Sequence, residues 1–233
     1  FPSWKLAQPF RYIAHNGEIN TLQGNLNWLK SSQKGLTSPL FAPEEMEMLL
    51  PLVTDGQSDS ASLDNMIELL TLSGRSLPHV MMMLIPEAWD GDDKMDPVKK
   101  AFYEFHASFM EPWDGPASIS FTDGEIIGAM LDRNGLRPSR YCLTHDDRVI
   151  MASETGALPI EPKLVKEKGR LQPGKMFVVD LKKGRVISDE ELKRDICSGR
   201  PYGEWLEQYK IRLENLPDPR VTFTPLEPAQ VFK

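Results

Sequence analysis

Hydrophobic residues recur at helical spacing through most of the first half of the chain. Before them, apolar and polar positions alternate over residues 10–15, which predicts one short strand that turns at Gly17. The helical period then predicts helices over residues 18–31, from Pro43 onward, over 60–73 and over 98–110. Residues 87–97 are polar and turn-forming, so we expect a surface loop there. The first half is therefore predicted to be rich in helices.

The pattern changes to a period of two after Pro116. The runs ASISFT and EIIGAML flank an Asp-Gly pair, which is typical of a β-hairpin with a tight turn. Further strands are predicted over residues 141–144, 148–152, 176–180 and 185–187, and a last helical stretch over 203–213. A capping box at Ser188 and Glu191 predicts a helix that ends at Gly199. Helices followed by an antiparallel sheet indicate an α+β fold.

The two ends of the sequence point to a longer polypeptide. The chain begins at Phe1 without an initiator methionine, and its last residues are extended and rich in proline. We interpret residues 1–210 as the C-terminal part of one folded domain, and residues 211–233 as a linker towards a further domain. On this interpretation the chain is a piece cut from a larger protein.

Composition argues against several classes of partner. The formal net charge is −7 and the isoelectric point is near 5.2, whereas a nucleic-acid or anionic membrane surface calls for clustered lysine and arginine. The longest apolar run, residues 80–86, is too short to cross a bilayer. Cys142 and Cys197 lie far apart without metal-ligand spacing. We therefore expect two inert thiols, no metal site, no nucleic acid and no membrane.

The first candidate site is the run HNGEIN, residues 15–20, where the predicted strand turns. Such a turn can present the side-chain amide of Asn16 beside the backbone N–H of Gly17, which is how a pair of oxyanion-hole donors is built. An Asn-Gly pair alone is common, and a lone histidine such as His15 is more often a packed core residue than a catalyst. The sequence contains neither the serine-nucleophile motif G-x-S-x-G nor a phosphate-binding glycine loop.

Two further motifs accompany this turn. In GQSDS, residues 56–60, Asp59 either caps the following helix, which its spacing favours, or faces a pocket and holds a substrate ammonium group. In DRNGLRP, residues 132–138, Arg133 and Arg137 belong to a charged turn between strands, and a phosphate-binding use of them is open. Each motif taken alone has a plain structural explanation.

Taken together and in this order, HNGEIN, SDS, LDRNGLRPSRY and MASE resemble the glutaminase domain of the glutamate synthases, which are class II glutamine amidotransferases. The segments SLPHVMMMLIPEAW and FMEPWDGPASISFTDG are more similar to this family than to glucosamine-phosphate synthase or amidophosphoribosyltransferase. The resemblance covers nearly the whole chain. It implies part of an N-terminal-nucleophile fold, an αββα sandwich with mainly antiparallel sheets.

The resemblance also implies roles for single residues. Asn16 and Gly17 correspond to the oxyanion hole for the tetrahedral intermediate of glutamine hydrolysis, and Asp59 to the carboxylate that binds the α-ammonium group of glutamine. The family's nucleophile is a cysteine at the processed N-terminus, and its arginine for the α-carboxylate lies just before the position of Phe1, so Arg11 does not take that role. We expect the chain alone to be inactive, with an open apolar sheet edge that favours self-association.

The resemblance implies a larger enzyme around this chain. In the family, ammonia from glutamine reaches 2-oxoglutarate at a flavin domain, so FMN and an iron–sulfur cluster are expected in the parent protein and not here. The expected partners are the remaining synthase domains and an electron-donating subunit or ferredoxin, in the cytoplasm or the plastid stroma. Two alternatives stay open: a non-catalytic amino-acid-binding or assembly module of the same fold, and another class II amidotransferase.

Overall fold

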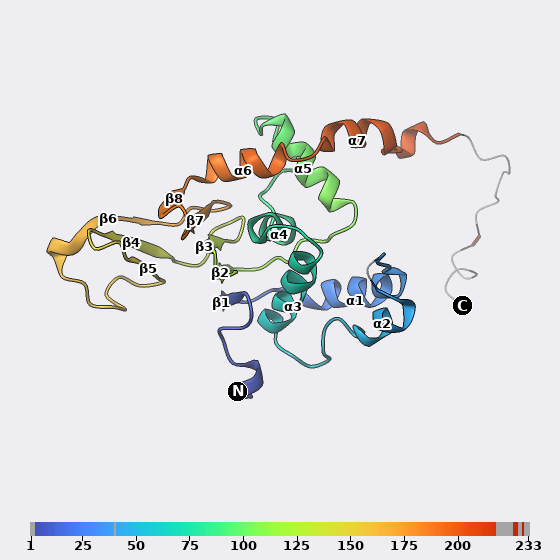
Figure 1. Ribbon diagram of the computed structural model, residues 1–233. Coiled ribbons are helices and arrows are strands. Elements are labelled where there is room, and N and C mark those ends of the chain that lie inside the picture. Colours follow the sequence, from blue (N-terminus) through green and yellow to red (C-terminus); the bar gives the residue numbers. More distant parts are fainter. Residues whose placement is uncertain (1–2, 40, 218–225, 228–229, 231–233) are drawn as a thin grey trace.

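A five-stranded antiparallel sheet forms the centre of the fold (Figure 1). The computed structural model describes residues 3–39, 41–217, 226–227 and 230. The strands of this sheet lie in the order β1 (Ile13–Gly17), β2 (Ala117–Thr122), β3 (Ile126–Leu131), β7 (Met176–Asp180) and β8 (Arg185–Ile187). Strand β1 is therefore an edge strand of the central sheet.

The helices of the described chain gather on one face of this sheet (Figure 1). They are α1 (Leu22–Ser32), α2 (Pro43–Met48), α3 (Asp59–Leu72), α4 (Leu77–Leu84), α5 (Pro97–Ala107), α6 (Asp189–Cys197) and α7 (Tyr202–Tyr209), with short 3₁₀ turns at Trp4–Leu6, Gln33–Gly35, Pro162–Leu164 and Leu213–Asn215. The register places Ile13 opposite Phe121 and Ile119 opposite Met130, so these side chains share one face. They form one buried cluster with apolar side chains from each of these helices except α2.

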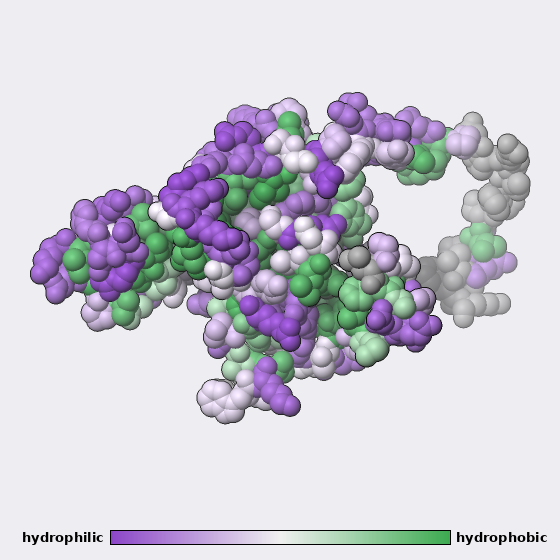
Figure 2. All heavy atoms as spheres, in the orientation of Figure 1, coloured by the Kyte–Doolittle hydropathy of each residue, from purple (hydrophilic) through white to green (hydrophobic). Residues whose placement is uncertain are grey.

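A three-stranded sheet meets the other face of the central sheet. Its order is β5 (Val149–Ala152), β4 (Arg140–Thr144) and β6 (Val165–Arg170). Met151 and Phe177 pack against the buried cluster of Ala129, Leu131 and Leu171. The ring centroids of Tyr141 and Phe177 are 4.5 Å apart. Beyond this contact the sheet projects from the body and is largely hydrophilic (Figures 1 and 2). The layers are helix, sheet and sheet, which is part of the expected αββα sandwich.

Most predicted elements are confirmed, and the differences have local causes. Helix α1 begins at Leu22 and not at residue 18, because the backbone pairing of β1 continues to Glu18, whose N–H donates to the carbonyl oxygen of Pro116. The N–H of Ile19 then donates to Asp59. The period does not predict α4, which is buried on nearly all sides, or β6, whose side chains are polar and mostly exposed. Helix α2 buries none of its residues. Phe1 and parts of the predicted linker (218–225, 228–229 and 231–233) lie outside the described residues.

Two histidines form a hydrogen-bonded pair between α4 and α5. His106 is 4% exposed, and its Nδ1 donates to the carbonyl oxygen of Phe102 at 2.7 Å, so its Nε2 is an acceptor. The Nε2 atoms of His79 and His106 are 3.0 Å apart, which requires the shared proton to sit on His79. Burial is the main cause that lowers the pKa of both rings to about 4, and the nearby Arg75 lowers it further. Both rings are therefore neutral in the folded chain at neutral pH.

We expect the free energy of unfolding to fall as the pH drops from 6.5 towards 4. In this interval the unfolded chain protonates both rings at their ordinary pKa of 6.5, whereas the folded chain keeps them neutral, so the unfolded state binds more protons. One pKa unit corresponds to about 1.4 kcal/mol, so we expect each ring to contribute a loss of up to roughly 3 kcal/mol. Urea unfolding at about pH 7.5 and about pH 4.5 measures it. An H79N/H106N variant should lose less over the same interval; an equal loss would contradict the assignment.

A buried lysine joins α6 to the segment that follows α4. Lys193 is 4% exposed, and its Nζ lies 2.7 Å from Glu87 Oε1, 2.8 Å from Asp189 Oδ1 and 2.6 Å from a backbone carbonyl oxygen. The contacts with Glu87 and the carbonyl oxygen are hydrogen bonds, and the contact with Asp189 is an ion pair. Burial raises the pKa of Glu87, but Lys193 and Lys99 outweigh it, so the pKa of Glu87 is lowered. Two carboxylates and one carbonyl oxygen therefore surround the buried ammonium group of Lys193.

Candidate active site

The chain turns at the end of β1 through a position that only glycine can occupy. Gly17 has a φ of 153°, and a Cβ atom there would lie 1.9 Å from the carbonyl oxygen of Pro116. Gly115 lies on the other side of the crossing, where a Cβ atom would lie 1.9 Å from the carbonyl oxygen of Glu18. The two glycines allow the two backbone segments to cross in contact. The shape of the turn is therefore fixed by backbone geometry.

The N–H of Gly17 points away from the central sheet. The even-numbered residues along β1 bond towards β2, as in the hydrogen bond from the Glu18 N–H to Pro116. Gly17 lies opposite Ala117, whose N–H and C=O both bond to Asp132. The N–H of Gly17 is thus directed outward from an edge strand, with no acceptor in the described part of the chain.

The neighbouring outward-facing groups of β1 are occupied by side chains. The N–H of Ile13 donates to Asp64 at 3.0 Å. At His15 the carboxamide of Gln8 takes the place of a neighbouring strand: it accepts from the N–H at 2.5 Å and donates to the carbonyl oxygen at 2.9 Å. The open edge expected for this sheet is therefore partly covered at β1, and the covered stretch stops just before the N–H of Gly17.

The side chain of Asn16 lies beside this donor. It is exposed, and the alternation along β1 directs it to the face opposite His15. Arg137 Nη2 donates to Asn16 Oδ1. A guanidinium group has only donors, so the carbonyl end of the amide faces Arg137 and the NH₂ end is left for another acceptor. An amide donor and a backbone donor thus lie on adjacent residues, as an oxyanion hole requires.

The turn over residues 132–138, which carries Arg137, is organised by a buried carboxylate. Asp132 is 2% exposed and accepts from three backbone N–H groups at 2.9, 3.0 and 3.3 Å. Arg133 leaves the same turn on its outer side and pairs with Asp114 at 2.5 Å. Both arginines of the motif therefore have protein partners, one a carboxylate and the other an amide oxygen.

His15, next to the turn at Gly17, points into the helix layer and is buried, as expected for a lone histidine in a strand. Its Nδ1 lies 2.8 Å from Ser60 Oγ, and Ser60 Oγ in turn donates to Asp59 Oδ1 at 3.2 Å. The proton of His15 therefore sits on Nδ1, and Nε2 is an acceptor. Burial is the main cause that lowers the pKa of His15, against the opposing charges of Asp59 and Glu18, so the ring is neutral at neutral pH.

Two buried polar atoms near the turn at Gly17 have no hydrogen-bond partner among the described residues. Among the described residues three buried side-chain nitrogen or oxygen atoms lack a hydrogen-bond partner, and two of them are His15 Nε2 and Arg137 Nε. A Cβ atom on Gly17 would lie 2.9 Å from His15 Nε2, so this acceptor adjoins the turn directly. Folded proteins rarely leave buried polar groups unpaired, and exceptions call for a ligand, a water molecule or a functional reason.

Asp59 is the first residue of α3 and not its cap, which corrects the interpretation that its spacing favoured. The N-cap is Ser58, whose Oγ accepts from the N–H of Ala61 at 3.1 Å. Asp59 Oδ2 accepts from the N–H of Ile19 at 2.8 Å, and Oδ1 accepts from the N–H of Ser60 at 2.7 Å. The carboxylate, 16% exposed, therefore fastens the start of α3 to the turn after Gly17.

The structure brings Asn16, Gly17 and Asp59 to one turn, and it adds residues that the sequence did not single out. Ser60 lies inside the SDS motif, so its neighbourhood was a signal. Gln8 belongs to no motif, and its contact with His15 has no counterpart in the sequence pattern. The residues that hold the site in place are therefore harder to predict from the sequence than the site residues themselves.

The cysteines lie away from this turn. Cys142 is half-buried in β4, and Cys197 is buried at the end of α6. Burial raises the pKa of Cys197 to about 12. In the described ranges no group of three or more His, Cys, Asp and Glu residues is placed to hold a metal ion. None of the described helices is long and apolar enough to cross a membrane.

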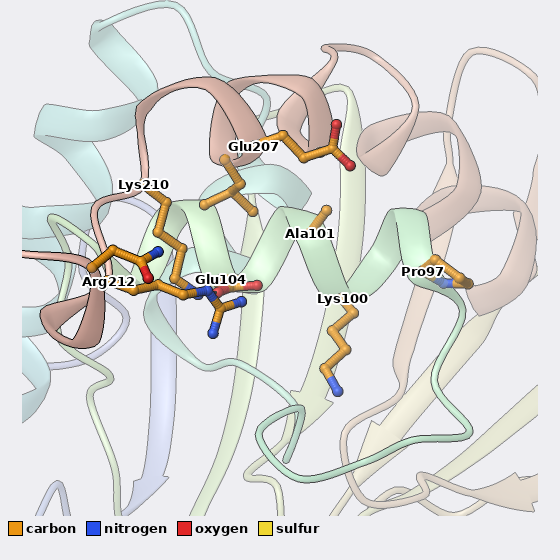
Figure 3. Close-up of a pocket in the computed structure, with 10 residues that line it drawn as sticks. Pro97, Lys100, Ala101, Glu104, Glu207, Lys210 and Arg212 are labelled. Carbon is orange, nitrogen blue, oxygen red and sulfur yellow. The ribbon is translucent and has the colours of Figure 1, made fainter.

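Two hollows of the described surface lie elsewhere. One of about 500 Å³ lies between α5 and α7, where Figure 3 shows Glu104 near Lys210, and these two side chains form an ion pair. Another, of about 620 Å³, adjoins the histidine pair. Neither is lined by a predicted site residue.

Comparisons with known proteins agree with these motifs. A family model described as "Glutamine amidotransferases class-II" matches residues 1–205. The chain is 50% identical over 219 residues to the "Glutamate synthase [NADPH] large chain" of Bacillus subtilis, a match that covers 94% of this chain and 14% of that protein. It is 49% identical over 210 residues to the "Ferredoxin-dependent glutamate synthase, chloroplastic" of Oryza sativa subsp. japonica, with 89% of this chain and 13% of that protein covered.

A solved structure of the glutamine phosphoribosylpyrophosphate amidotransferase of B. subtilis is 19% identical with a TM-score of 0.41, over 76% of this chain and 28% of that chain. The chain spans only 14% and 13% of the two glutamate synthases. The family model, in contrast, matches residues 1–205 of the 233. The chain belongs to the class II glutamine amidotransferases.

Proposed function

We propose that this chain is the glutaminase part of a glutamate synthase, with the Asn16 amide and the Gly17 N–H as its oxyanion hole. One observation carries the proposal: the outward N–H of Gly17 has no acceptor in the described residues, and it adjoins an amide whose carbonyl end is held by Arg137. Two free donors on adjacent residues suit an oxygen atom that becomes negative in a transition state.

The reaction is hydrolysis of the side-chain amide of glutamine. A thiolate attacks the amide carbon, and the carbonyl oxygen becomes an oxyanion. The proton that the thiol gave up passes to the amide nitrogen, so the C–N bond breaks and ammonia leaves. Water then cleaves the thioester and releases glutamate. Asn16 and Gly17 stabilise the oxyanion in both steps.

We propose that the nucleophile comes from another part of a longer polypeptide. Cys142 lies in the three-stranded sheet, and Cys197 is buried with a pKa raised to about 12, so neither thiol suits attack at this turn. The length of the matched glutamate synthases supports such a polypeptide. In it, residues 1–210 would belong to the glutaminase domain and 211–233 to a linker.

Asp59 is proposed to bind the α-ammonium group of glutamine. Its carboxylate lies at the turn and remains 16% exposed. It accepts from two backbone N–H groups and from the Ser60 hydroxyl, which leaves one lone pair for a ligand. In the complete gene product, Asp59→Asn should raise the KM for glutamine by about 10- to 100-fold, because a hydrogen bond to a charged group contributes about 1.5–3 kcal/mol. Steady-state ammonia release measures the change.

Asp55→Asn is the matched control, since Asp55 is exposed and pairs with Lys30 at 2.9 Å. It should leave the KM unaltered. An unchanged KM in Asp59→Asn would remove Asp59 from the ligand site.

Ammonia release from glutamine by the complete gene product tests the proposed function itself. Glutamine binding without hydrolysis would support the amino-acid-binding module instead. Ammonia release that depends on a phosphoribosyl acceptor, and not on 2-oxoglutarate, would support another class II amidotransferase.

The rest of the proposed enzyme lies beyond these residues. FMN and an iron–sulfur cluster would be held by other domains, because the described chain offers two separated free cysteines and no thiolate set. The partners are the remaining synthase domains and an electron donor, either a pyridine-nucleotide-linked subunit or ferredoxin. The compartment is the cytoplasm or, as the name of the rice relative suggests, the plastid stroma.

A further inference from the structure

Arg137 makes an unusual contact for an arginine. Its Nη2 donates to the amide oxygen of Asn16, and no carboxylate pairs with it in the described residues. Its Nε is buried without a partner. Arg133, four residues earlier, has the ordinary arrangement with Asp114 at 2.5 Å. The guanidinium group of Arg137, which has no carboxylate partner in the described residues, therefore contacts the oxygen of the Asn16 amide.

The placement of Arg137 is built into the fold. The turn that carries it is fixed by the buried Asp132, which accepts from three backbone N–H groups. Gly135 takes a φ of 62° in the same turn, where a Cβ atom would lie 2.5 Å from the ring of Pro173. The guanidinium thus reaches Asn16 from a stiff turn and across 121 positions of sequence.

We propose that Arg137 is a positioning residue that orients and polarises the Asn16 amide; the proposal rests on the proposed oxyanion hole. By donating to Oδ1, Arg137 fixes the amide with its NH₂ end towards the oxyanion. Hydrogen bonds in a chain strengthen one another, so a donor at the oxygen makes the amide N–H a better donor. This effect is largest when the partner oxygen is negative, so it should appear in kcat more than in KM.

The test uses the complete gene product and steady-state glutamine hydrolysis. Arg137→Met, which keeps much of the length and loses the donors, should lower kcat by about 10- to 100-fold and change KM by less than about 3-fold, as expected for a lost charge-assisted hydrogen bond. Arg137→Lys keeps a charged donor and should recover part of the loss. The control is Arg148→Met, which removes an equal charge from an exposed turn where Arg148 pairs with Asp146.

A double-variant cycle separates positioning from other roles. Because Arg137 acts through Asn16, Arg137→Met should have little further effect on kcat once Asn16 is alanine. Additive losses, or a loss confined to KM, would overturn the proposal, the latter because Arg137 would then contact substrate. If Asn16→Ala alone leaves kcat unchanged, the proposed oxyanion hole fails; if Asn16→Ala lowers kcat and Arg137→Met does not, only the positioning role fails.

Discussion

Asn16→Ala should lower kcat for glutamine hydrolysis by about 100- to 1000-fold in the complete gene product, since this is the usual cost of removing one oxyanion-hole donor. Asn16 is exposed, and its one side-chain hydrogen bond in the described residues is the one from Arg137. The variant should therefore fold normally. The loss should appear in kcat and kcat/KM alike, because the donor is used mainly when the oxygen becomes negative.

Asn27→Ala provides the matched control for this prediction. Asn27 is exposed on α1 and accepts from Gln23 at 3.1 Å, away from the turn. Its kcat should equal that of the unaltered enzyme. A fall of less than about 10-fold in Asn16→Ala, with circular dichroism unchanged, would show that the amide is not an oxyanion donor.

Lys193→Met should lower the free energy of unfolding of the 233-residue chain by about 3–5 kcal/mol, because breaking a buried ion pair leaves its partners uncompensated. Glu87 would keep Lys99, but Asp189 would lose its contact with the ammonium group. A folded domain has a total stability of about 5–15 kcal/mol, so the loss is a large share of it. Urea unfolding followed by circular dichroism measures the change.

Lys175→Met tests whether burial is the cause. Lys175 is an exposed lysine that pairs with Glu190 at 2.8 Å, and its removal should cost less than about 1 kcal/mol. In a second comparison, Glu87→Gln combined with Lys193→Met should cost less than the sum of the two single variants. Equal losses at Lys193 and Lys175 would contradict the assignment of Lys193 as a buried anchor.

The fold was predictable where its signals are local. The hairpin of β2 and β3 follows from a period of two and an Asp-Gly turn, and the cap of α6 follows from Ser188, whose Oγ accepts from the N–H of Glu191. Helix α4 was missed because it is buried on nearly all sides and so shows no amphipathic period. Strand β6 was missed because it pairs with β4 mainly through its backbone, while its side chains are polar and mostly exposed.

The candidate site divides in the same way. Asn16 and Gly17 could be proposed from the sequence because both lie on one turn of the chain. The role of Asp59 was left between a cap and a ligand, since only the fold shows that Ser58 caps α3 and that Asp59 reaches back to Ile19. The contact of Arg137 with Asn16 joins residues 121 positions apart, and no local pattern encodes it.

Gln8 gives β1 a property that an ordinary edge strand lacks. A sheet edge is usually a row of unpaired N–H and C=O groups with which any extended chain can form hydrogen bonds. Here the carboxamide of Gln8 occupies both backbone groups of His15, so an incoming strand must first displace Gln8. The N–H of Gly17 is left without an acceptor in the described residues. Backbone pairing of this edge with another extended chain is thereby made less favourable at His15.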